Sequence, residues 1–230
     1  MNVSLIIPAY NEEKRLGVFL ESIVDYTSQR QQDIQEIMVV DDGSFDATVI
    51  VAEKFSSRLP LCVLKHSQNK GKGAAVQTGV MAASGSYIIF MDADGATPIT
   101  ELPKMTDALQ QAQVAIGNRW MTGAQTRRHS LLRQLSGFTY RKYMSLFGLG
   151  QIDTMCGFKG YHQDIARKLF TSLIEERWLF DAEIAYKAVK AGYTIRNFPI
   201  KWESKDGSKL DTKTLIKTAL QIWPLIRKIK

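Results

Sequence analysis

Short apolar runs alternate with segments of helical periodicity along the first half of the chain. The apolar runs are too short for helices and end in polar or turn residues, which is typical of buried strands. They lie at residues 3–8, 36–40, 61–64, 87–91 and 114–117. The segments between them repeat apolar residues three and four positions apart, as an amphipathic helix does. Helices are therefore predicted at residues 13–26, 46–55, 74–83 and 102–111.

This alternation predicts an α/β fold with a mainly parallel sheet and helices on both faces. The pattern after Arg119 is less regular. It predicts helices at residues 130–147, 163–170 and 181–190, and strands within 152–161 and at 194–200. The tail, residues 212–230, has helical spacing, and Pro224 should kink or end that helix. We expect one α/β domain over residues 1–210 and a basic amphipathic helix over 211–230.

The composition is that of a soluble globular protein with a full core. The chain has 230 residues, of which 45% are hydrophobic and 23% charged, so a disordered chain or a disulfide scaffold is excluded. No apolar run reaches the roughly 18–20 residues of a membrane-spanning helix. The first apolar run lacks a positive leader and predicts a strand rather than a signal peptide. Cys62 and Cys156 are far apart, which fits a reducing compartment and makes no metal site.

The net charge of +7 is concentrated in two segments. Residues 119–150 contain six Lys or Arg and no Asp or Glu, and residues 201–230 contain eight and three. A local basic surface favours an anionic partner, such as nucleic acid, phosphate or an acidic membrane. Nucleic acid is the weaker interpretation, because the aromatic residues of these segments lie on the apolar stripes of predicted helices and not on an exposed stacking platform.

A pair of carboxylates follows the fourth predicted strand. Asp92 and Asp94 are one residue apart at the carboxyl end of that strand, where apolar packing cannot accommodate two charges. A divalent cation would satisfy both, and hard oxygen ligands favour Mg²⁺ or Mn²⁺, particularly an ion also bound by phosphate oxygens. The alternative is a solvated turn that ends at Gly95.

Two further polar segments follow predicted strands at the same edge of the sheet. A carboxylate at Asp41 or Asp42 can accept a hydrogen bond from a nucleobase or ribose, or can serve only the turn. The sequence Gly71-Lys72-Gly73 opens a helix, but Val76 stands where a dinucleotide fingerprint has its third glycine, so that match is weak. A loop with free backbone N–H groups and a lysine near a diphosphate remains an open interpretation.

Eight short motifs occur in order along the chain. Five come first: PAYNE (8–12), VVDDGS (39–44), NKGKGAA (69–75), MDADGATP (91–98) and IGNRW (116–120). In this order they resemble the inverting family 2 glycosyltransferases of the GT-A fold. Three later motifs are similar to the dolichyl-phosphate β-glucosyltransferase and polyprenyl-phosphate glycosyltransferase branch: DTMCGFKGY (153–161), RWLFDAEI (177–184) and DGSKL (206–210). The resemblance covers residues 3–210, nearly the whole chain.

The resemblance implies a donor site built from the first four motifs. Either Asp41 or Asp42 would read the nucleobase, and Lys72 would lie in the loop beside the donor. Asp92 and Asp94 would hold the metal ion that bridges the diphosphate. The base and ribose pocket would be lined by Pro8, Ala9, Tyr10 and Glu12.

The later motifs imply catalytic and acceptor residues. Arg119 would meet phosphate charge, and Asp181 would lie near the acceptor and the sugar, as a general base or as an orienting group. Ser208 and Lys209 would lie on a loop that closes over the acceptor phosphate, with Lys205 beside them.

The chain departs from the pattern of related enzymes at two positions. Dolichyl-phosphate mannose synthases carry Gln as a further metal contact where this chain has Ala96. Polyprenyl-phosphate enzymes often carry Arg where this chain has Ser204. Clamping of an acceptor phosphate would then depend on Lys205 and Lys209.

The resemblance implies a metal-dependent, inverting enzyme that transfers glucose from UDP-glucose to a polyprenyl or dolichyl phosphate. The alternatives are GDP-mannose as the donor, a sugar hydroxyl as the acceptor in polysaccharide synthesis, and a non-catalytic nucleotide-binding module. A lipid acceptor implies a membrane surface. The basic amphipathic segments at residues 130–147 and 212–230 predict peripheral attachment on the cytoplasmic face, unless both pack on the sheet or on a second subunit.

Overall fold

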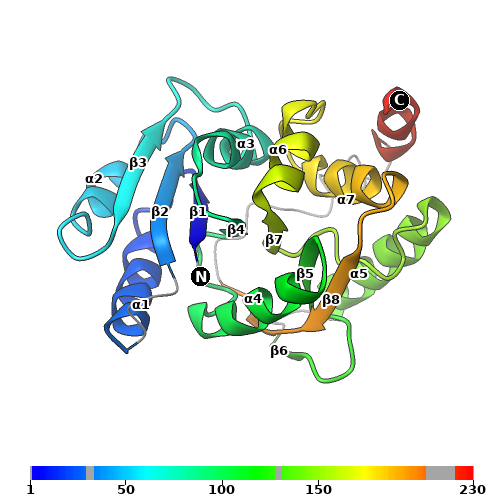
Figure 1. Ribbon diagram of the computed structural model, residues 1–230, viewed down its shortest axis with the longest axis horizontal. Coiled ribbons are helices and arrows are strands. Elements are labelled where there is room, and N and C mark those ends of the chain that lie inside the picture. Colours follow the sequence, from blue (N-terminus) through cyan, green and yellow to red (C-terminus); the bar gives the residue numbers. More distant parts are fainter. Residues whose placement is uncertain (1, 30–33, 128–130, 206–220, 230) are drawn as a thin grey trace.

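A mostly parallel seven-stranded sheet lies between two layers of helices (Figure 1). The computed structural model describes residues 2–29, 34–127, 131–205 and 221–229. The strand order is β3-β2-β1-β4-β7-β5-β8. Strand β7 runs antiparallel to both of its neighbours, and the other pairs are parallel, so the predicted α/β fold with a mainly parallel sheet is confirmed. The strands are β1 (Val3–Ala9), β2 (Ile34–Asp41), β3 (Leu61–Lys65), β4 (Tyr87–Met91), β5 (Val114–Asn118), β7 (Phe158–His162) and β8 (Ile195–Pro199).

The helices divide between the two faces of this sheet. One face is covered by α1 (Leu16–Gln29), α2 (Thr48–Glu53) and α4 (Leu102–Gln111). The other is covered by α3 (Lys72–Ala82), α6 (Gln163–Thr171) and α7 (Phe180–Lys190), with α5 (Leu131–Met144) and a last helix at residues 221–228 beyond them. Two 3₁₀ turns (Ile99–Glu101 and Ser145–Phe147) and a small parallel sheet of β6 (Gln125–Arg127) and β9 (Lys201–Glu203) complete the described elements.

Strand β1 shows why the apolar runs are continuous rather than alternating. Val3, Leu5 and Ile7 point into the hydrophobic cluster on the α1 and α4 side. Ile6 lies in the second cluster, on the α3 side. Successive side chains of a strand face opposite ways, so a central strand with helices on both faces has apolar residues at every position.

The tail packs on the protein more closely than the sequence suggests. The helix at residues 221–228 continues past Pro224, and residues 212–220 of the predicted tail helix lie outside the described residues. Ile222 and Leu225 are buried in the second cluster. The Trp223 ring, which is 54% exposed, lies 5.9 Å from that of Phe147. In the part of the chain that the structure describes, no helix combines the length and apolar character needed to cross a bilayer.

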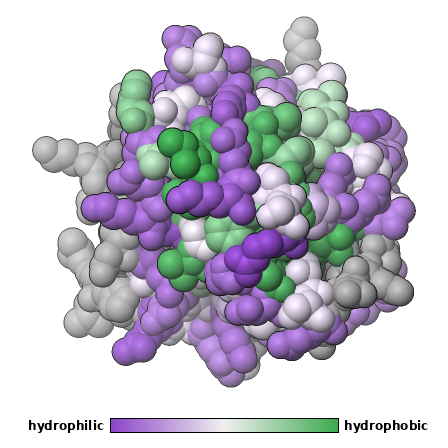
Figure 2. Space-filling view, turned by 90° about the vertical axis from the view of Figure 1, so that its left-hand side faces the viewer, coloured by the Kyte–Doolittle hydropathy of each residue, from purple (hydrophilic) through white to green (hydrophobic). Residues whose placement is uncertain are grey.

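Strand β3 is one edge of the sheet, and the surface around it is largely hydrophilic with scattered apolar side chains (Figure 2). The strand has five residues, and Cys62 and Lys65 on it are exposed. A short edge strand with an exposed lysine is a poor template for pairing with another chain.

One glycine of α3 sets how closely this helix approaches the sheet. A Cβ atom at Gly79 would lie 2.5 Å from Cγ2 of Ile6, which no real Cβ tolerates. We expect Gly79→Ala to lower the free energy of unfolding by about 1–3 kcal/mol, because overpacking exceeds the gain in helix propensity. Urea denaturation measures this change.

Gly17→Ala is the matched control, since Gly17 is also a helical glycine but its Cβ would meet only Cγ1 of Val51, at 3.3 Å. It should leave stability unchanged or raise it by up to about 1 kcal/mol. Equal effects of the two substitutions would contradict the close approach of α3 to β1.

Candidate active site

The polar motifs meet at one edge of the sheet. The parallel strands β1, β2, β4 and β5 all end there, and the antiparallel strand β7 begins there. Open α/β sheets bind ligands at this edge. The loop of residues 153–157, which precedes β7, is brought among the loops that follow the parallel strands.

The loops after β1 and β2 are joined by reciprocal hydrogen bonds. The backbone N–H of Asn11 donates to Oγ of Ser44 at 2.8 Å, and the N–H of Phe45 donates to Oδ1 of Asn11 at 2.9 Å. The N–H of Glu12 donates to Oγ1 of Thr48 at 2.7 Å. Asn11 has a positive φ of 50°, which Asn tolerates better than most residues. The loops that carry the first two motifs are therefore fixed relative to each other.

The residues predicted to line the base pocket lie at the end of β1 and in the loop that follows it. Pro8 and Ala9 end β1 opposite Val40 and Asp41 of β2. The Tyr10 ring stands edge-on to that of Phe45, with the ring centres 6.4 Å apart. The carboxylate of Glu12, by contrast, is held by the guanidinium of Arg15 through bonds of 2.5 and 2.7 Å. Glu12 therefore has a partner within the protein, and the assignment of the set to a base and ribose pocket stays a prediction.

Asp41 and Asp42, which the sequence left as alternatives, have different surroundings. The carboxylate of Asp42 accepts hydrogen bonds from the side chains of His66 and Asn69 and from the backbone N–H groups of Lys70 and Gly71, all at 2.8–2.9 Å. It organises the loop before α3. Asp41 is equally buried, yet its Oδ1 has no hydrogen-bond partner among the described residues. A buried carboxylate oxygen without a donor favours Asp41 as the group that reads a base.

The carboxylates of Asp92 and Asp94 follow β4, as expected, and Lys72 lies beside them. Nζ of Lys72 is 2.5 Å from Oδ1 of Asp92, whose side chain is 35% exposed. Burial alone would raise the pKa of Asp92, but the charge and hydrogen bond of Lys72, together with the charges of Lys159 and Arg119, lower that pKa. Burial and the charge of Asp92 together raise the pKa of Asp94. Two close carboxylates repel each other when both are ionised, and a bound cation offsets this repulsion.

This arrangement fits a divalent cation that needs further ligands. Among the described residues, no group of three or more His, Cys, Asp or Glu is placed to hold a metal ion. Asp92 and Asp94 would therefore supply two carboxylates and leave positions for phosphate oxygens and water. Mg²⁺ bound to substrate phosphates has this kind of coordination.

Gly157 lies directly against the carboxylate of Asp92. The N–H of Asp92 donates to the carbonyl of Gly157 at 3.0 Å. A Cβ atom at Gly157 would lie 1.9 Å from Oδ2 of Asp92. A side chain at position 157 would therefore displace the Asp92 carboxylate, which accounts for the glycine of the DTMCGFKGY motif.

The guanidinium of Arg119 is paired within the protein and is not a free phosphate-binding group. Its Nε and Nη2 donate to the two carboxylate oxygens of Asp153, both at 2.8 Å, and its guanidinium lies 5.1 Å from the centre of the Trp202 ring. Burial alone would lower the pKa of Arg119, but Asp153 outweighs it and raises that pKa. Arg119 lies at the correct edge, and Asp153, which the sequence analysis did not single out, neutralises it.

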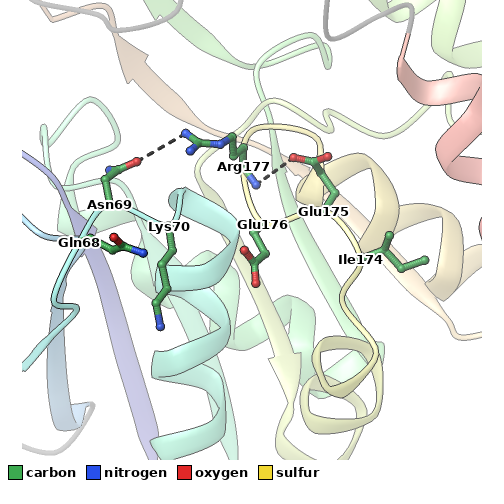
Figure 3. Close-up of a pocket in the computed structure, with 7 residues that line it drawn as sticks. All are labelled: Gln68, Asn69, Lys70, Ile174, Glu175, Glu176 and Arg177. Carbon is green, nitrogen blue, oxygen red and sulfur yellow. Dashed lines mark hydrogen bonds between the residues drawn. The ribbon is translucent and has the colours of Figure 1, made fainter.

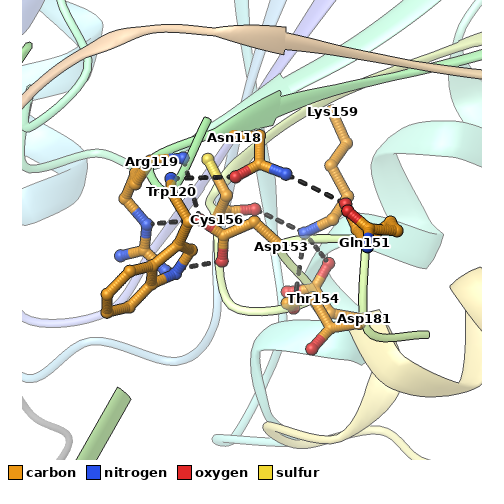
Figure 4. A network of polar contacts seen from close by, with 9 residues as sticks. All are labelled: Asn118, Arg119, Trp120, Gln151, Asp153, Thr154, Cys156, Lys159 and Asp181. Atoms are coloured by element: carbon orange, nitrogen blue, oxygen red, sulfur yellow. Dashed lines mark hydrogen bonds and ion pairs between the residues drawn. The ribbon is translucent and has the colours of Figure 1, made fainter. Parts of the chain in front are cut away.

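Asp181 is also paired, with a lysine that the sequence analysis missed (Figure 4). Nζ of Lys159 lies 2.8 Å from Oδ1 of Asp181 and also donates to the carbonyls of Thr154 and Cys156. The Lys159 side chain is 1% exposed. Burial raises the pKa of Asp181, although Lys159 and Lys72 act in the opposite direction. A charged residue within the apolar segment FKGY was the available signal for Lys159.

Four backbone N–H groups around Lys72, those of Lys70, Gly71, Gly73 and Ala74, are engaged within the protein, which corrects the interpretation that this loop offers them to a phosphate. The N–H groups of Gly73 and Ala74 donate to the carbonyls of Arg177 and Glu176. Residues 68–70 and 174–177 line an open, polar cavity of about 410 Å³ outside this contact (Figure 3). Lys72 can therefore act on a donor through its ammonium group, not through a helix N-terminus.

The expected acceptor-phosphate residues are only partly described. Nζ of Lys205 lies 3.0 Å from Oε2 of Glu203. Ser208 and Lys209 lie outside the described residues. Their assignment to an acceptor phosphate stays a prediction.

Comparison with solved structures defines the class of this fold. Glucosyl-3-phosphoglycerate synthase from Mycobacterium tuberculosis, solved in complex with Mn²⁺, UDP and glucosyl-3-phosphoglycerate, superimposes with a TM-score of 0.69 and 19% identity, over 98% of this chain and 78% of that one. Mannosyl-3-phosphoglycerate synthase from Rubrobacter xylanophilus gives a TM-score of 0.73 and 16% identity, over 100% of this chain and 74% of that one. The fold is that of the GT-A glycosyltransferases.

Comparison of sequences places the chain within one family. Residues 4–170 match the family model for glycosyl transferase family 2. The dolichyl-phosphate β-glucosyltransferase of Drosophila melanogaster is 37% identical over 91% of this chain and 69% of the relative. The Homo sapiens protein of that name is 32% identical over 90% of this chain and 69% of the relative. The chain belongs to glycosyl transferase family 2, and its resemblance to the dolichyl-phosphate β-glucosyltransferase branch is confirmed.

The buried Arg119–Asp153 pair predicts a pH-dependent contribution to stability. Burial would raise the pKa of Asp153, but Arg119 outweighs it and lowers that pKa. A depressed carboxyl pKa gives stability that is complete above the unfolded value of about 3.9 and is lost as the pH falls through the folded value. Asp153→Asn should therefore cost about 3 kcal/mol near pH 7, and progressively less below about pH 4.

Urea denaturation between pH 3 and pH 7 measures this difference. Asp164→Asn is the control, because Asp164 forms an exposed pair with Lys168 at 3.8 Å and should cost less than about 0.5 kcal/mol. A cost for Asp153→Asn that does not vary with pH would contradict the assignment.

Proposed function

We propose that this chain is a metal-dependent, inverting glucosyltransferase that moves glucose from UDP-glucose to a dolichyl or polyprenyl phosphate. The observation that carries the proposal is the placement of Asp92, Asp94 and Lys72 at the same sheet edge as the buried Asp181. The names of the sequence relatives support the sugar and the acceptor. The solved relative with UDP and Mn²⁺ supports the nucleotide and the metal.

Three charged residues would act on the leaving diphosphate in this reaction. Asp92 and Asp94 would hold Mg²⁺ or Mn²⁺, which neutralises the leaving diphosphate. Lys72 adds positive charge beside the same diphosphate. As the bond from C1 of glucose to the UDP oxygen breaks, UDP leaves with the bonding electrons. A lipid phosphate oxygen forms the new bond to C1 from the opposite face, which inverts the anomeric centre.

The acceptor decides what Asp181 does. A phosphate monoester has a second pKa of about 6, so a lipid phosphate is an anion near neutral pH and attacks without a base. Asp181 then orients the sugar or the acceptor. If the acceptor were a sugar hydroxyl, Asp181 would have to remove its proton. The raised pKa of Asp181 suits that second function, in which the chain would build a polysaccharide.

The metal assignment is tested with Asp94. Asp94→Ala should reduce glucose transfer by at least about 100-fold, since the diphosphate loses its neutralising cation, and should leave the circular dichroism spectrum unchanged. Chelation of wild-type protein should abolish turnover, and added Mn²⁺ or Mg²⁺ should restore it. Full activity in excess chelator would remove the metal from the mechanism.

The nucleobase assignment is tested by calorimetric titration with UDP and with GDP in the presence of Mn²⁺. UDP should bind more tightly. Asp41→Asn should weaken UDP binding about 10-fold, because Asp41 offers a buried oxygen that lacks a donor. Thr126→Ala, in the exposed strand β6, is the control and should bind UDP like the wild type. A clear preference for GDP would change the proposed donor to GDP-mannose.

A lipid acceptor places this chain at a membrane surface, and we propose that it attaches peripherally on the cytoplasmic face. Phe138, Leu146 and Trp223 are exposed apolar residues near the second hydrophobic cluster. The guanidinium of Arg227 lies 5.0 Å from the centre of the Trp223 ring, and Lys228 is exposed beside it. Apolar side chains combined with basic residues give interfacial binding.

Vesicle co-sedimentation tests this attachment. Binding should rise with the fraction of anionic lipid and fall with added salt, because each basic residue contributes about 1 kcal/mol near such a surface. The variant Arg227→Gln/Lys228→Gln should weaken binding at least about 5-fold. Lys54→Gln is the control, because Lys54 is exposed directly after α2, and α2 lies on the far side of the molecule from the last helix (Figure 1). Equal sedimentation with and without vesicles would exclude the attachment.

A further inference from the structure

The segment of residues 174–177 is pressed against the N-terminus of α3. Its carbonyls at Glu176 and Arg177 accept hydrogen bonds from Ala74 and Gly73, at 3.0 and 3.2 Å. A Cβ atom at Gly71 would lie 2.5 Å from the Glu176 carbonyl oxygen, and one at Gly73 would lie 2.8 Å from the same atom. The two glycines therefore permit this contact, whether or not they also serve a phosphate.

One buried carboxylate holds the segment in place. Oε1 of Glu183 accepts the N–H of Ile174 at 2.9 Å, and Oε2 accepts the N–H of Glu175 at 2.7 Å. The Glu183 side chain is 0% exposed, and Nζ of Lys187 neutralises it at 2.5 Å. Both carboxylate oxygens are engaged, so an amide at this position cannot replace them: its NH₂ group would face a backbone donor.

Lys72 lies between this contact and the carboxylate of Asp42. On its N-terminal side, Asp42 fixes the N–H groups of Lys70 and Gly71. On its C-terminal side, the segment 174–177 fixes the N–H groups of the next two residues. The Lys72 ammonium reaches Asp92 beside the rings of Phe90 and Phe180, 5.8 and 5.9 Å from their centres. The backbone that carries this lysine is therefore held on both sides.

We propose that Glu183 is a positioning residue for Lys72. It lies on α7 with Asp181, and through residues 174–177 it fixes the helix that presents Lys72 to Asp92. The acceptor side of the site thereby sets the position of a donor-side charge. The proposal rests on the proposed function in that Lys72 acts on the donor diphosphate. Its structural part stands independently of the donor's identity.

Hydrogen exchange tests the structural part without an activity assay. In Glu183→Gln, peptides that cover residues 72–76 should exchange at least about 5-fold faster than in the wild type, because the segment that caps them is loosened. Peptides from β1 and β4 should exchange at the wild-type rate. An unchanged rate at residues 72–76, or a uniform rise that includes β1, would overturn the proposal.

A double-mutant cycle tests the functional part. Glu183→Gln should lower kcat/KM for UDP-glucose about 10-fold when Lys72 is present, and less than about 2-fold in the Lys72→Met background, because a residue that acts through Lys72 has nothing to position once Lys72 is gone. A 10-fold loss in both backgrounds would show that Glu183 acts independently of Lys72 and would overturn the proposal.

Glu36→Gln is the matched control. Glu36 also holds a loop, because its carboxylate accepts hydrogen bonds from the N–H of Ser84 at 2.7 Å and from the hydroxyl of Ser4 at 2.5 Å. It lies at the other end of the strands, where β1 and β2 begin. It should lower stability while leaving kcat/KM unchanged. If the wild type transfers no glucose from UDP-glucose, the proposed function fails, and hydrogen exchange alone then decides the role of Glu183.

Discussion

The site depends on a buried ammonium group that needs three acceptors. Lys159 is buried in strand β7, where an unpaired charge would cost several kcal/mol. Asp181 and the carbonyls of Thr154 and Cys156 satisfy it together, and no one of them would suffice. Strand β7, the loop before it and the start of α7 are therefore fixed relative to one another.

The rest of the charge arrangement follows from this anchor. The fixed loop carries Asp153 to Arg119 and sets Gly157 against Asp92, which in turn holds Lys72. Three acid–base pairs thus stand at one edge of the sheet, formed by Asp92, Asp153 and Asp181 with Lys72, Arg119 and Lys159. Each pair neutralises itself, so the proposed diphosphate and divalent cation, whose charges largely balance each other, would meet paired charges that already cancel.

The sequence predicts the strands and the edge because both depend on local patterns. Apolar runs mark β1 and β4, and the order of strand and helix implies that polar loops meet at the carboxyl ends. The sequence does not predict that β7 is antiparallel to its neighbours, because the residues of a strand do not encode its direction in the sheet. Partners distant in sequence are also hidden. Asp42, which organises a loop, and Asp41, which we propose reads the base, look alike in the sequence until the four donors around Asp42 are seen.

The insertion of β7 between β4 and β5 has a consequence for how the polypeptide folds as it is made. The first four strands of the sheet in chain order, β1 to β4, are contiguous in the sheet and can pair once about 90 residues have emerged. Strand β5 has no pairing partner until β7 emerges, about 40 residues later. Until then the exposed edges of β4 and β5 are open to mispairing. If the ribosome paused after β5 and before β7, the nascent chain would be held at the length at which the edges of β4 and β5 are both exposed to mispairing.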